Sequence, residues 1–277
     1  MTTPPEDPRQ YTRIGEFRLV VEDWMDDNAV IPDDIRMPGR GEPLSPALKE
    51  WAVEFKKKLG AKGWIAPDWP VEYGGGGLTR NHARIIEEEL RRRSLPTLGV
   101  SLMHAAAIRA YGTEEQKTTL LASLLRGELT MVHAFNELGH GSDLSANETS
   151  AVRDGDEFLI NGRKDQITSL LPPDLVLTLA VTDPDAPPAH RFTVVVVDAK
   201  ASGLVVEAEN LLVGGREFRF LFTDVPVATT QIVGEEGQGI EIAEMMVAIE
   251  NGGMATFSLD QQEEVERREP KTLGNLL

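Results

Sequence analysis

Gly139, His140, Gly141, Ser142 and Asp143 form a polar stretch that could bind a ligand. Glycines let the backbone come close to a bound group, and successive backbone N–H groups in such a loop can hold an anion. Ser142 would add a hydroxyl group. A turn that connects a helix to a strand needs the same residue types. The stretch therefore predicts either a ligand-binding loop or a simple joint between two domains.

Glu250 lies in an apolar segment, between Ile249 and Asn251. A carboxylate held beside an apolar face can act as a general base. The alternative is a solvated position on a helix, which is what we expect for Glu241 and Glu244. The residues alone leave both interpretations of Glu250 open.

The residue types and their spacing do not support other kinds of catalytic site. The chain has no cysteine, which excludes disulfides and thiol nucleophiles. The 5 histidines lack the spacing of a zinc site, and His104 and His133 are expected to be structural. No serine lies in the Gly-x-Ser-x-Gly elbow of hydrolases. The glycine-rich turn at 234–239 has the wrong glycine order for a dinucleotide-binding loop, and it contains two glutamates that would repel a phosphate.

Composition narrows the class of protein. The chain has 277 residues and a formal net charge of −17. A nucleic-acid-binding protein would show a basic footprint, and an anionic membrane surface would repel this charge. The N-terminus lacks the basic and apolar regions of a signal peptide. These features predict a cytoplasmic protein that binds neither nucleic acid nor membrane.

The elements on either side of the stretch differ in type. Residues 1–129 predict an all-α domain with helices at about 11–28, 46–60, 80–93, 95–111 and 114–125. Ser45 is expected to cap the second helix, and Thr113 with Gln116 forms a capping box before the last. Glycines and prolines between 63 and 77 predict no regular structure there.

Residues 130–233 predict a β domain, because their apolar residues alternate. Tight turns are expected at Asp154-Gly155-Asp156 and at Asn161-Gly162. Strands are expected at 150–152, 157–160, 175–181, 192–197, 204–207 and 218–222. Residues 234–277 form the last unit, and the apolar residues after Gly239 predict a helix over about 239–268.

Several segments together resemble the acyl-CoA dehydrogenase family, in the order that the family has them. They cover nearly the whole chain. They are Trp64 with Glu72-Tyr73-Gly74-Gly75, Tyr111 to Lys117, Asn136 to Asp143, Asp154 to Thr168, Thr223 to Val227, and Gly234 to Gly239.

This resemblance implies an α+β multidomain fold with an N-terminal all-α domain, an antiparallel, barrel-like β domain and one long helix of a truncated C-terminal bundle. It implies FAD as cofactor and an acyl-CoA thioester as substrate in fatty acid metabolism. A glutamate removes the α-proton while the β-hydrogen passes to the flavin as hydride. An electron-transfer flavoprotein or a similar acceptor, and a homo- or hetero-oligomer, are implied as partners.

The resemblance also implies roles for particular residues. Counting from the glycine-rich turn, Glu250 falls at one of the family's two positions for the catalytic base, and Asn251 and Ser142 are expected at the substrate. The residues expected at the flavin are Phe135, Asn136, Ser142, Gln166, Ile167 and Thr168.

Some residues depart from the family pattern. Asn136 replaces the usual threonine, Gln166 an aromatic residue, and Asn251 the usual arginine. Because most of the C-terminal bundle is also missing, a second hypothesis is a non-catalytic partner subunit or a degenerate remnant. A third hypothesis keeps the fold but makes the protein a flavin oxidase or monooxygenase.

Overall fold

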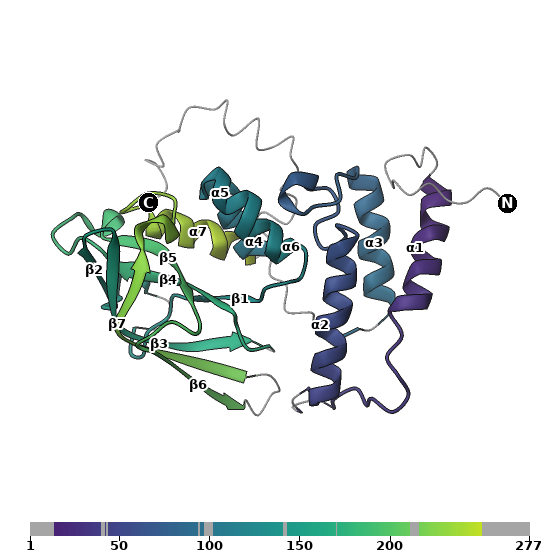
Figure 1. The fold of residues 1–277 in the computed structure, drawn as a ribbon, viewed down its shortest axis with the longest axis horizontal. Helices are drawn as coiled ribbons and strands as arrows, with labels where there is room; N and C mark the ends of the chain where they lie inside the picture. The colour runs from purple at the N-terminus through teal and green to yellow at the C-terminus, as the bar shows by residue number, and fades with distance from the viewer. Residues whose placement is uncertain are drawn as a thin grey trace.

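The structure is a computed structural model that describes residues 14–39, 42, 44–93, 95–96, 102–140, 143–169, 171–210 and 216–250. Helices form the first half of the chain and a sheet forms most of the second half (Figure 1). None of the described helices has the length and apolar character that crossing a bilayer requires.

Three helices stand side by side at the N-terminal end of the molecule (Figure 1): α1 (Ile14–Asn28), α2 (Pro46–Ala61) and α3 (Arg80–Arg92). Helix α2 begins where the sequence predicted, because the Ser45 side chain accepts a hydrogen bond from the Leu48 backbone N–H. The apolar faces of the three helices share one core, to which Phe17, Phe55 and Ile86 belong. Burial of this face, more than helix propensity, stabilises such helices.

A second group of helices leads to the sheet: α4 (Leu102–Tyr111), α5 (Glu114–Gln116), a π-helical segment η3 (Lys117–Leu121) and α6 (Ala122–Leu125). The predicted capping box of Thr113 and Gln116 is confirmed. Two predictions were wrong. Leu95 and Pro96 are not helical, and the segment predicted to be irregular contains a short 3-10 helix, η2 (Val71–Tyr73).

The second half forms one 8-stranded sheet with the order β6-β7-β3-β2-β4-β5-β8, and β1 pairs with β4. Its strands are β1 (Met131–Ala134), β2 (Ser150–Asp154), β3 (Glu157–Ser169), β4 (Leu175–Val181), β5 (Phe192–Asp198), β6 (Leu204–Asn210), β7 (Arg216–Ala228) and β8 (Ile232–Val233). The expected antiparallel arrangement is only partly right, because β1 and β2 both run parallel to β4. The sheet is therefore mixed, and no pairing between the described strands β6 and β8 closes it into a barrel.

One of the two predicted turns was wrong. Gly155 and Asp156 do connect β2 to β3, but Asn161 and Gly162 lie inside β3, at a register shift opposite β7. Gly162 has φ +144°, and a Cβ at this position would lie 2.7 Å from the Thr149 Cα. The glycine therefore permits a bulge and a close approach between strands rather than a reversal of the chain.

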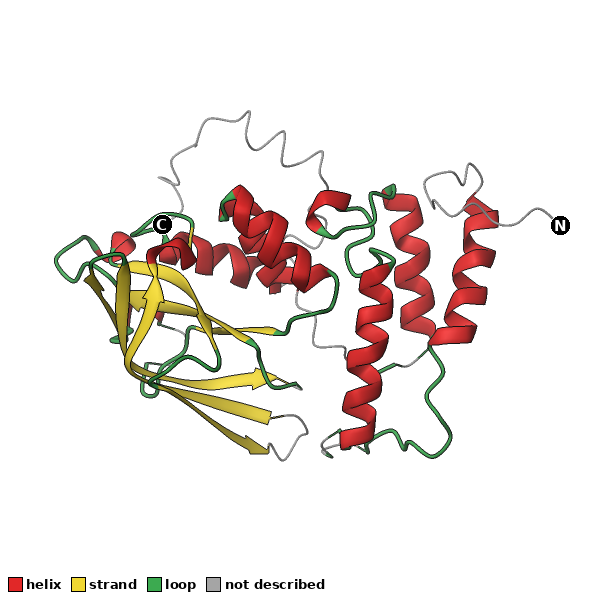
Figure 2. Cartoon of the chain, viewed as in Figure 1, coloured by secondary structure: helices red, strands yellow, loops and turns green. Residues whose placement is uncertain are grey.

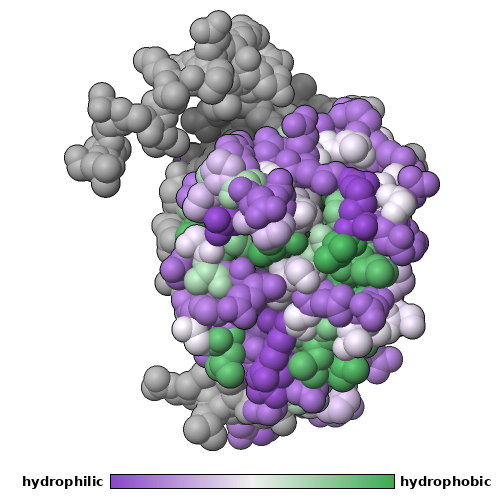
Figure 3. Space-filling view, turned by 90° about the vertical axis from the view of Figure 1, so that its left-hand side faces the viewer, coloured by the Kyte–Doolittle hydropathy of each residue, from purple (hydrophilic) through white to green (hydrophobic). Residues whose placement is uncertain are grey.

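The two faces of the sheet carry separate cores. Phe158, Phe220 and Val225 lie in the core of one face. The other face is covered by α4, α6 and α7 (Gly239–Glu250), as Figure 2 shows. In this second core, helices that precede the sheet in the sequence and one that follows it pack on the same strands. At the end of the molecule farthest from α1, hydrophobic residues form small separate groups among hydrophilic ones (Figure 3).

Candidate functional site

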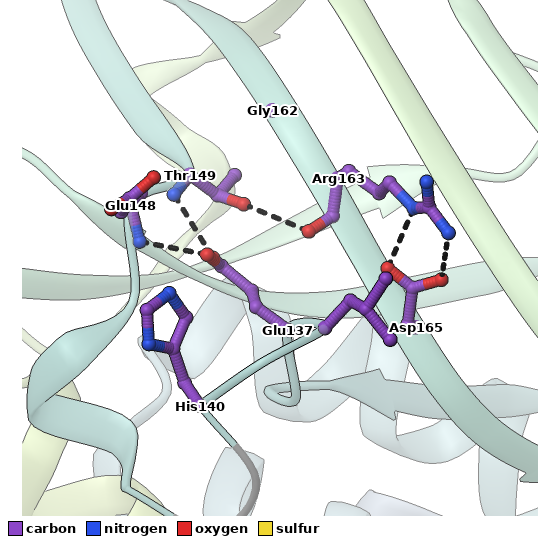
Figure 4. Close-up of a pocket in the computed structure, with 8 residues that line it drawn as sticks. Glu137, His140, Glu148, Thr149, Gly162, Arg163 and Asp165 are labelled. Carbon is purple, nitrogen blue, oxygen red and sulfur yellow. Dashed lines mark hydrogen bonds and ion pairs between the residues drawn. The ribbon is translucent and has the colours of Figure 1, made fainter.

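The polar stretch is preceded by Asn136 and Glu137, which follow β1, and the buried carboxylate of Glu137 holds this whole loop in place. Glu137 Oε1 accepts hydrogen bonds from Lys164 Nζ at 2.8 Å and from the Thr149 backbone N–H at 2.9 Å. Its second oxygen, Oε2, accepts one from the Glu148 backbone N–H at 2.8 Å. Figure 4 shows Glu137 reaching across to the segment that leads into β2. The carboxylate therefore connects the stretch to both β2 and β3.

Electrostatics favour the charged form of this pair at neutral pH. Burial alone would raise the pKa of Glu137, but the Lys164 ammonium and the hydrogen bonds outweigh it and lower the pKa. Burial lowers the pKa of Lys164 to about 8, against the attraction of Glu137. Because that pKa remains above 7, Lys164 is mainly protonated at neutral pH. The Lys164 side chain is 0% exposed, so this ion pair is part of the interior.

The stretch also contacts a bulge in β3. The Asp165 backbone N–H donates to the Asn136 carbonyl at 3.0 Å. The register with β7 shifts between Lys164 and Ile167, and Gln166 has φ +60°. A non-glycine residue in this left-handed region costs on the order of 1–3 kcal/mol. The bulge turns the Gln166 side chain outward, and it is exposed.

Two arginines hold the Asp165 carboxylate beside the bulge. Arg163 donates to it from Nε and Nη2, each at 2.7 Å. Arg219 on β7 donates from Nε at 2.8 Å. Burial would raise the pKa of Asp165, but these guanidinium groups lower it. The Asp165 side chain thus stays charged and cannot swing toward a ligand at Gln166.

A pocket of about 350 Å³ lies beside these anchors (Figure 4). Its lining combines acidic and basic side chains, and comprises Glu137, Leu138, His140, Glu148, Thr149, Gly162, Arg163 and Asp165. Within the described ranges, no group of three or more histidine or acidic side chains is arranged to hold a metal ion. Glu137, Arg163 and Asp165 are already paired by the contacts above, so we assign these side chains a structural rather than a catalytic role.

The structure places the predicted flavin residues on different faces. Asn136 is half-buried and lies beside the bulge, while Gln166 and Thr168 are exposed. Phe135 is buried in the helix-covered core, and Ile167 is buried in the core of the opposite face. Ile167 could therefore contact a ligand only through its backbone. Ser142 and Asn251, which were predicted at the substrate, lie outside the described residues.

Glu250 is the last described residue of α7, and it is exposed. Met246, one turn earlier, is buried in the helix-covered core. The charge of Glu250 acts on His133 of β1, whose pKa is lowered by burial and partly raised again by this carboxylate. Met246 and Phe135 belong to the same core, so the helix that carries the predicted base packs on the face of the sheet where Phe135 is buried.

Sequence reasoning missed the partners of these residues. Neither the Glu137–Lys164 pair nor the hydrogen bond of 3.0 Å between His104 and His133 was predicted. The partners in each pair are separated by 27 and 29 residues. The one available signal was the alternation along β1, which places His133 on the same face as Met131 and Phe135.

Comparison with known proteins identifies the family. The model of the acyl-CoA dehydrogenase N-terminal domain matches residues 42–128, and that of the acyl-CoA dehydrogenase middle domain matches residues 133–225. The chain belongs to the acyl-CoA dehydrogenase family. The resemblance noted in the sequence is thereby confirmed.

Relatives in this family are longer than the chain. Acyl-CoA dehydrogenase FadE26 of Mycobacterium tuberculosis is 33% identical over 211 residues, which are 73% of this chain and 53% of FadE26. The 3-(aryl)acrylate reductase of Clostridium sporogenes is 30% identical over 229 residues, 79% of this chain and 60% of the reductase. The chain thus spans about half to three-fifths of these relatives.

Solved structures of family members share the fold. The steroid ACAD Tcur3481-Tcur3483 has a TM-score of 0.71 at 28% identity, covering 90% of this chain and 64% of the solved one. The ChsE4-ChsE5 complex from Mycobacterium tuberculosis has a TM-score of 0.68 at 26% identity, covering 89% of this chain and 60% of the solved one. An acyl-CoA dehydrogenase fold of helices plus a mixed sheet is therefore established for this chain.

Proposed function

We propose that the chain takes part in FAD-dependent α,β-dehydrogenation of an acyl-CoA thioester. The observation that carries the proposal is the meeting of three parts. The loop at Asn136 is fixed to the β3 bulge by the hydrogen bond from Asp165, and α7, the helix that carries Glu250, packs in the same core as Phe135. Family membership supplies the reaction class, and these contacts supply a place for it.

The residues at this place suit a flavin. Asn136, Gln166 and Thr168 offer hydrogen-bonding side chains that are not buried in a core. The positive φ of Gln166 holds its carboxamide out from the sheet. Such groups match the polar edge of an isoalloxazine ring. When bound, FAD supplies the acceptor for the hydride, and the protein supplies position and polarity.

Different residues of the chain would then serve in proton transfer, cofactor orientation and substrate binding. Glu250 accepts the α-proton of the thioester, and its exposed position at the end of α7 makes it reachable. Asn136, Gln166 and Thr168 orient the cofactor by hydrogen bonds. Ser142 and Asn251 keep their predicted roles at the substrate. Electron-transfer flavoprotein as acceptor and a place in fatty acid metabolism complete the proposal.

The second candidate is a subunit that works, or only assembles, with another chain. Two of the similar solved structures, Tcur3481-Tcur3483 and ChsE4-ChsE5, are each named as a pair of proteins. On this reading, a steroid thioester joins the candidate substrates, because one of those structures is a steroid ACAD.

The test is the absorbance of the flavin. The full chain, expressed with FAD supplementation, is expected to show a flavin band that bleaches anaerobically with a matching acyl-CoA. The panel should contain straight-chain, branched, aryl and steroid side-chain thioesters. Bleaching only after a partner chain is added would favour the second candidate, and no bleaching under any condition would refute dehydrogenation. Oxygen consumption without an added acceptor would indicate an oxidase.

A matched pair of variants tests the base. Glu250→Gln is expected to keep the flavin band and to slow bleaching by about 10²–10⁴-fold, the usual contribution of a general base. Glu244→Gln is the control, because Glu244 is an exposed glutamate on the same helix. Equal bleaching rates in the two variants would remove Glu250 from the reaction.

A further inference from the structure

The bulge in β3 lies opposite a single residue of β7. Between two regular cross-strand pairs, β3 has two residues, Asp165 and Gln166, where β7 has only Arg219. The flanking pairs are Lys164 with Phe220 and Ile167 with Phe218. Two residues against one is the arrangement that defines a β-bulge. The extra residue lets Lys164 and Ile167, which are three positions apart, lie on the same face of the sheet. Arg219 is therefore the residue of β7 best placed to fix the bulge.

The guanidinium of Arg219 joins three strands. Its Nε donates to Asp165 Oδ1 at 2.8 Å, and its Nη1 donates to Glu207 Oε2 at 2.9 Å. Glu207 lies directly opposite Arg219 on β6, and the Glu209 carboxylate of the same strand is 3.9 Å from Nη1. Because a guanidinium is planar, its donors have fixed directions. The carboxylates of β6 thus hold the guanidinium in the orientation in which it bonds Asp165.

Asp165 is held at both its side chain and its backbone. Its side chain is only 4% exposed and accepts hydrogen bonds from Arg163 as well as from Arg219. Its backbone N–H donates to the Asn136 carbonyl at 3.0 Å. Arg163 is on the same strand, two residues earlier, so it moves together with Asp165. Of these two arginines, it is Arg219 that ties the carboxylate to another strand.

Gln166 depends on such restraint. Its φ of +60° is a conformation that costs energy for a residue with a Cβ. Its side chain is exposed, so burial does not hold it there. The restraint must come from its neighbours, because Asp165 is clamped before it and Ile167 is buried in the core after it. If the Asp165 carboxylate were released, the bulge could relax toward extended backbone, which would turn the Gln166 side chain to the other face.

We propose that Arg219 is a positioning residue, which holds the β3 bulge and with it the left-handed conformation of Gln166 and the bond from Asp165 to Asn136. The consequence for FAD rests on the proposed function, because Asn136 and Gln166 are the residues proposed to orient the cofactor. The contact between Arg219 and the bulge does not depend on that function. Arg219 acts through Asp165, so its loss should change the backbone of the bulge first and the cofactor second.

The first experiment measures the bulge without cofactor or substrate. Hydrogen exchange of the Asp165 backbone amide is followed by NMR in the ¹⁵N-labelled full chain, since this amide donates to Asn136. In Arg219→Met, exchange is expected to become about 10–100-fold faster, the equivalent of one charge-assisted hydrogen bond. In Arg163→Met the increase should be smaller, although that change removes two hydrogen bonds to the same carboxylate. An unchanged rate in Arg219→Met, or a larger increase in Arg163→Met, would overturn the proposal.

A second substitution tests whether Arg219 acts through Gln166. Glycine has no Cβ and adopts positive φ without strain. Adding Gln166→Gly to Arg219→Met is therefore expected to slow the exchange of the Asp165 amide again. If Arg219 only held β6 to β7, the added change would bring no recovery, and that result would overturn the proposal. Arg219→Lys keeps the charge but not the planar fork, so its exchange rate should lie between those of the unmodified chain and Arg219→Met.

The last experiment measures the affinity of the full chain for FAD by the quenching of flavin fluorescence. Arg219→Met is expected to weaken binding by about 2–10-fold, the equivalent of one hydrogen bond. Arg153→Met is the matched control, because Arg153 also lies on a strand and pairs with an exposed carboxylate, that of Glu236. Equal affinities in the two variants would overturn the proposal. If the unmodified chain does not bind FAD, the proposed function fails, and the amide exchange alone decides whether Arg219 holds the bulge.

Discussion

Replacing Glu137 by glutamine tests how strongly the buried ion pair holds the loop. The change removes the negative charge and keeps one carbonyl oxygen, which can replace only one of the two carboxylate oxygens that accept from the Thr149 and Glu148 backbone N–H groups. Lys164, with its side chain 0% exposed, is left without its counter-ion. Removing one partner of a buried ion pair typically costs about 3–5 kcal/mol.

A second route gives a lower limit to the magnitude. Lys164 can escape the uncompensated charge by releasing its proton. From its pKa of about 8 in the folded chain, being neutral at pH 7 costs roughly 1.4 kcal/mol, at 1.36 kcal/mol per pKa unit. We therefore expect Glu137→Gln to lower the free energy of unfolding by between about 1.4 and 5 kcal/mol, a substantial part of a domain's total of about 5–15.

The assay is urea unfolding followed by far-UV circular dichroism at pH 7. The control is Glu87→Gln, which breaks an exposed pair with Arg80 at 2.9 Å and is expected to cost at most about 1 kcal/mol. Lys164→Met combined with Glu137→Gln should recover part of the loss, because no buried charge remains. A loss below about 1 kcal/mol for Glu137→Gln would refute the reasoning.

Two further predictions concern stability. The pKa of His104 is about 3 in the folded chain, against about 6.5 when unfolded, so the unfolded state binds the extra proton between these values. The contribution of neutral His104 to the free energy of unfolding is therefore fully present above about pH 6.5. It decreases as the pH is lowered, by about 2 kcal/mol at pH 5. In His104→Gln, urea titrations at pH 8 and pH 5 should no longer show this difference. Gly162→Ala should cost about 1–3 kcal/mol or more in the same assay, because its Cβ would lie 2.7 Å from the Thr149 Cα. Gly155→Ala, with φ +63° and no atom within 4 Å of the new Cβ, should cost only about 1–2 kcal/mol; equal losses at the two glycines would contradict the packing argument.

The two predicted turns show what the local sequence can predict about the fold and what it cannot. Asp154-Gly155-Asp156 and Asn161-Gly162 carry the same signal, since both offer a glycine that tolerates positive φ. Only the first reverses the chain. At the second, β7 continues alongside β3 past the glycine, so pairing with a distant strand decides the outcome. Local chemistry specified the backbone conformation but not the strand partner.

The site was predictable only through the resemblance to a known family. Asn136 and the residues around Gln166 were expected at one cofactor through the family resemblance, and the hydrogen bond from the Asp165 backbone to the Asn136 carbonyl shows that the two segments are adjacent. His104 and His133 carried no such signal, because a single histidine on a helix and another on a strand are ordinary core residues. Their significance arises only when α4 and β1 pack together, which depends on the whole fold.

Strand β1 connects the parts of the site that the sequence keeps apart. His133 bonds His104 of α4, and Phe135 lies in the helix-covered core. Asn136 meets the β3 bulge, and Glu137 fixes the loop to β2 and β3. These five consecutive positions, 133–137, therefore join the loop directly to the helix-covered strand. Loosening the buried ion pair should consequently weaken the contact between Asn136 and the β3 bulge, and with it the proposed flavin contacts.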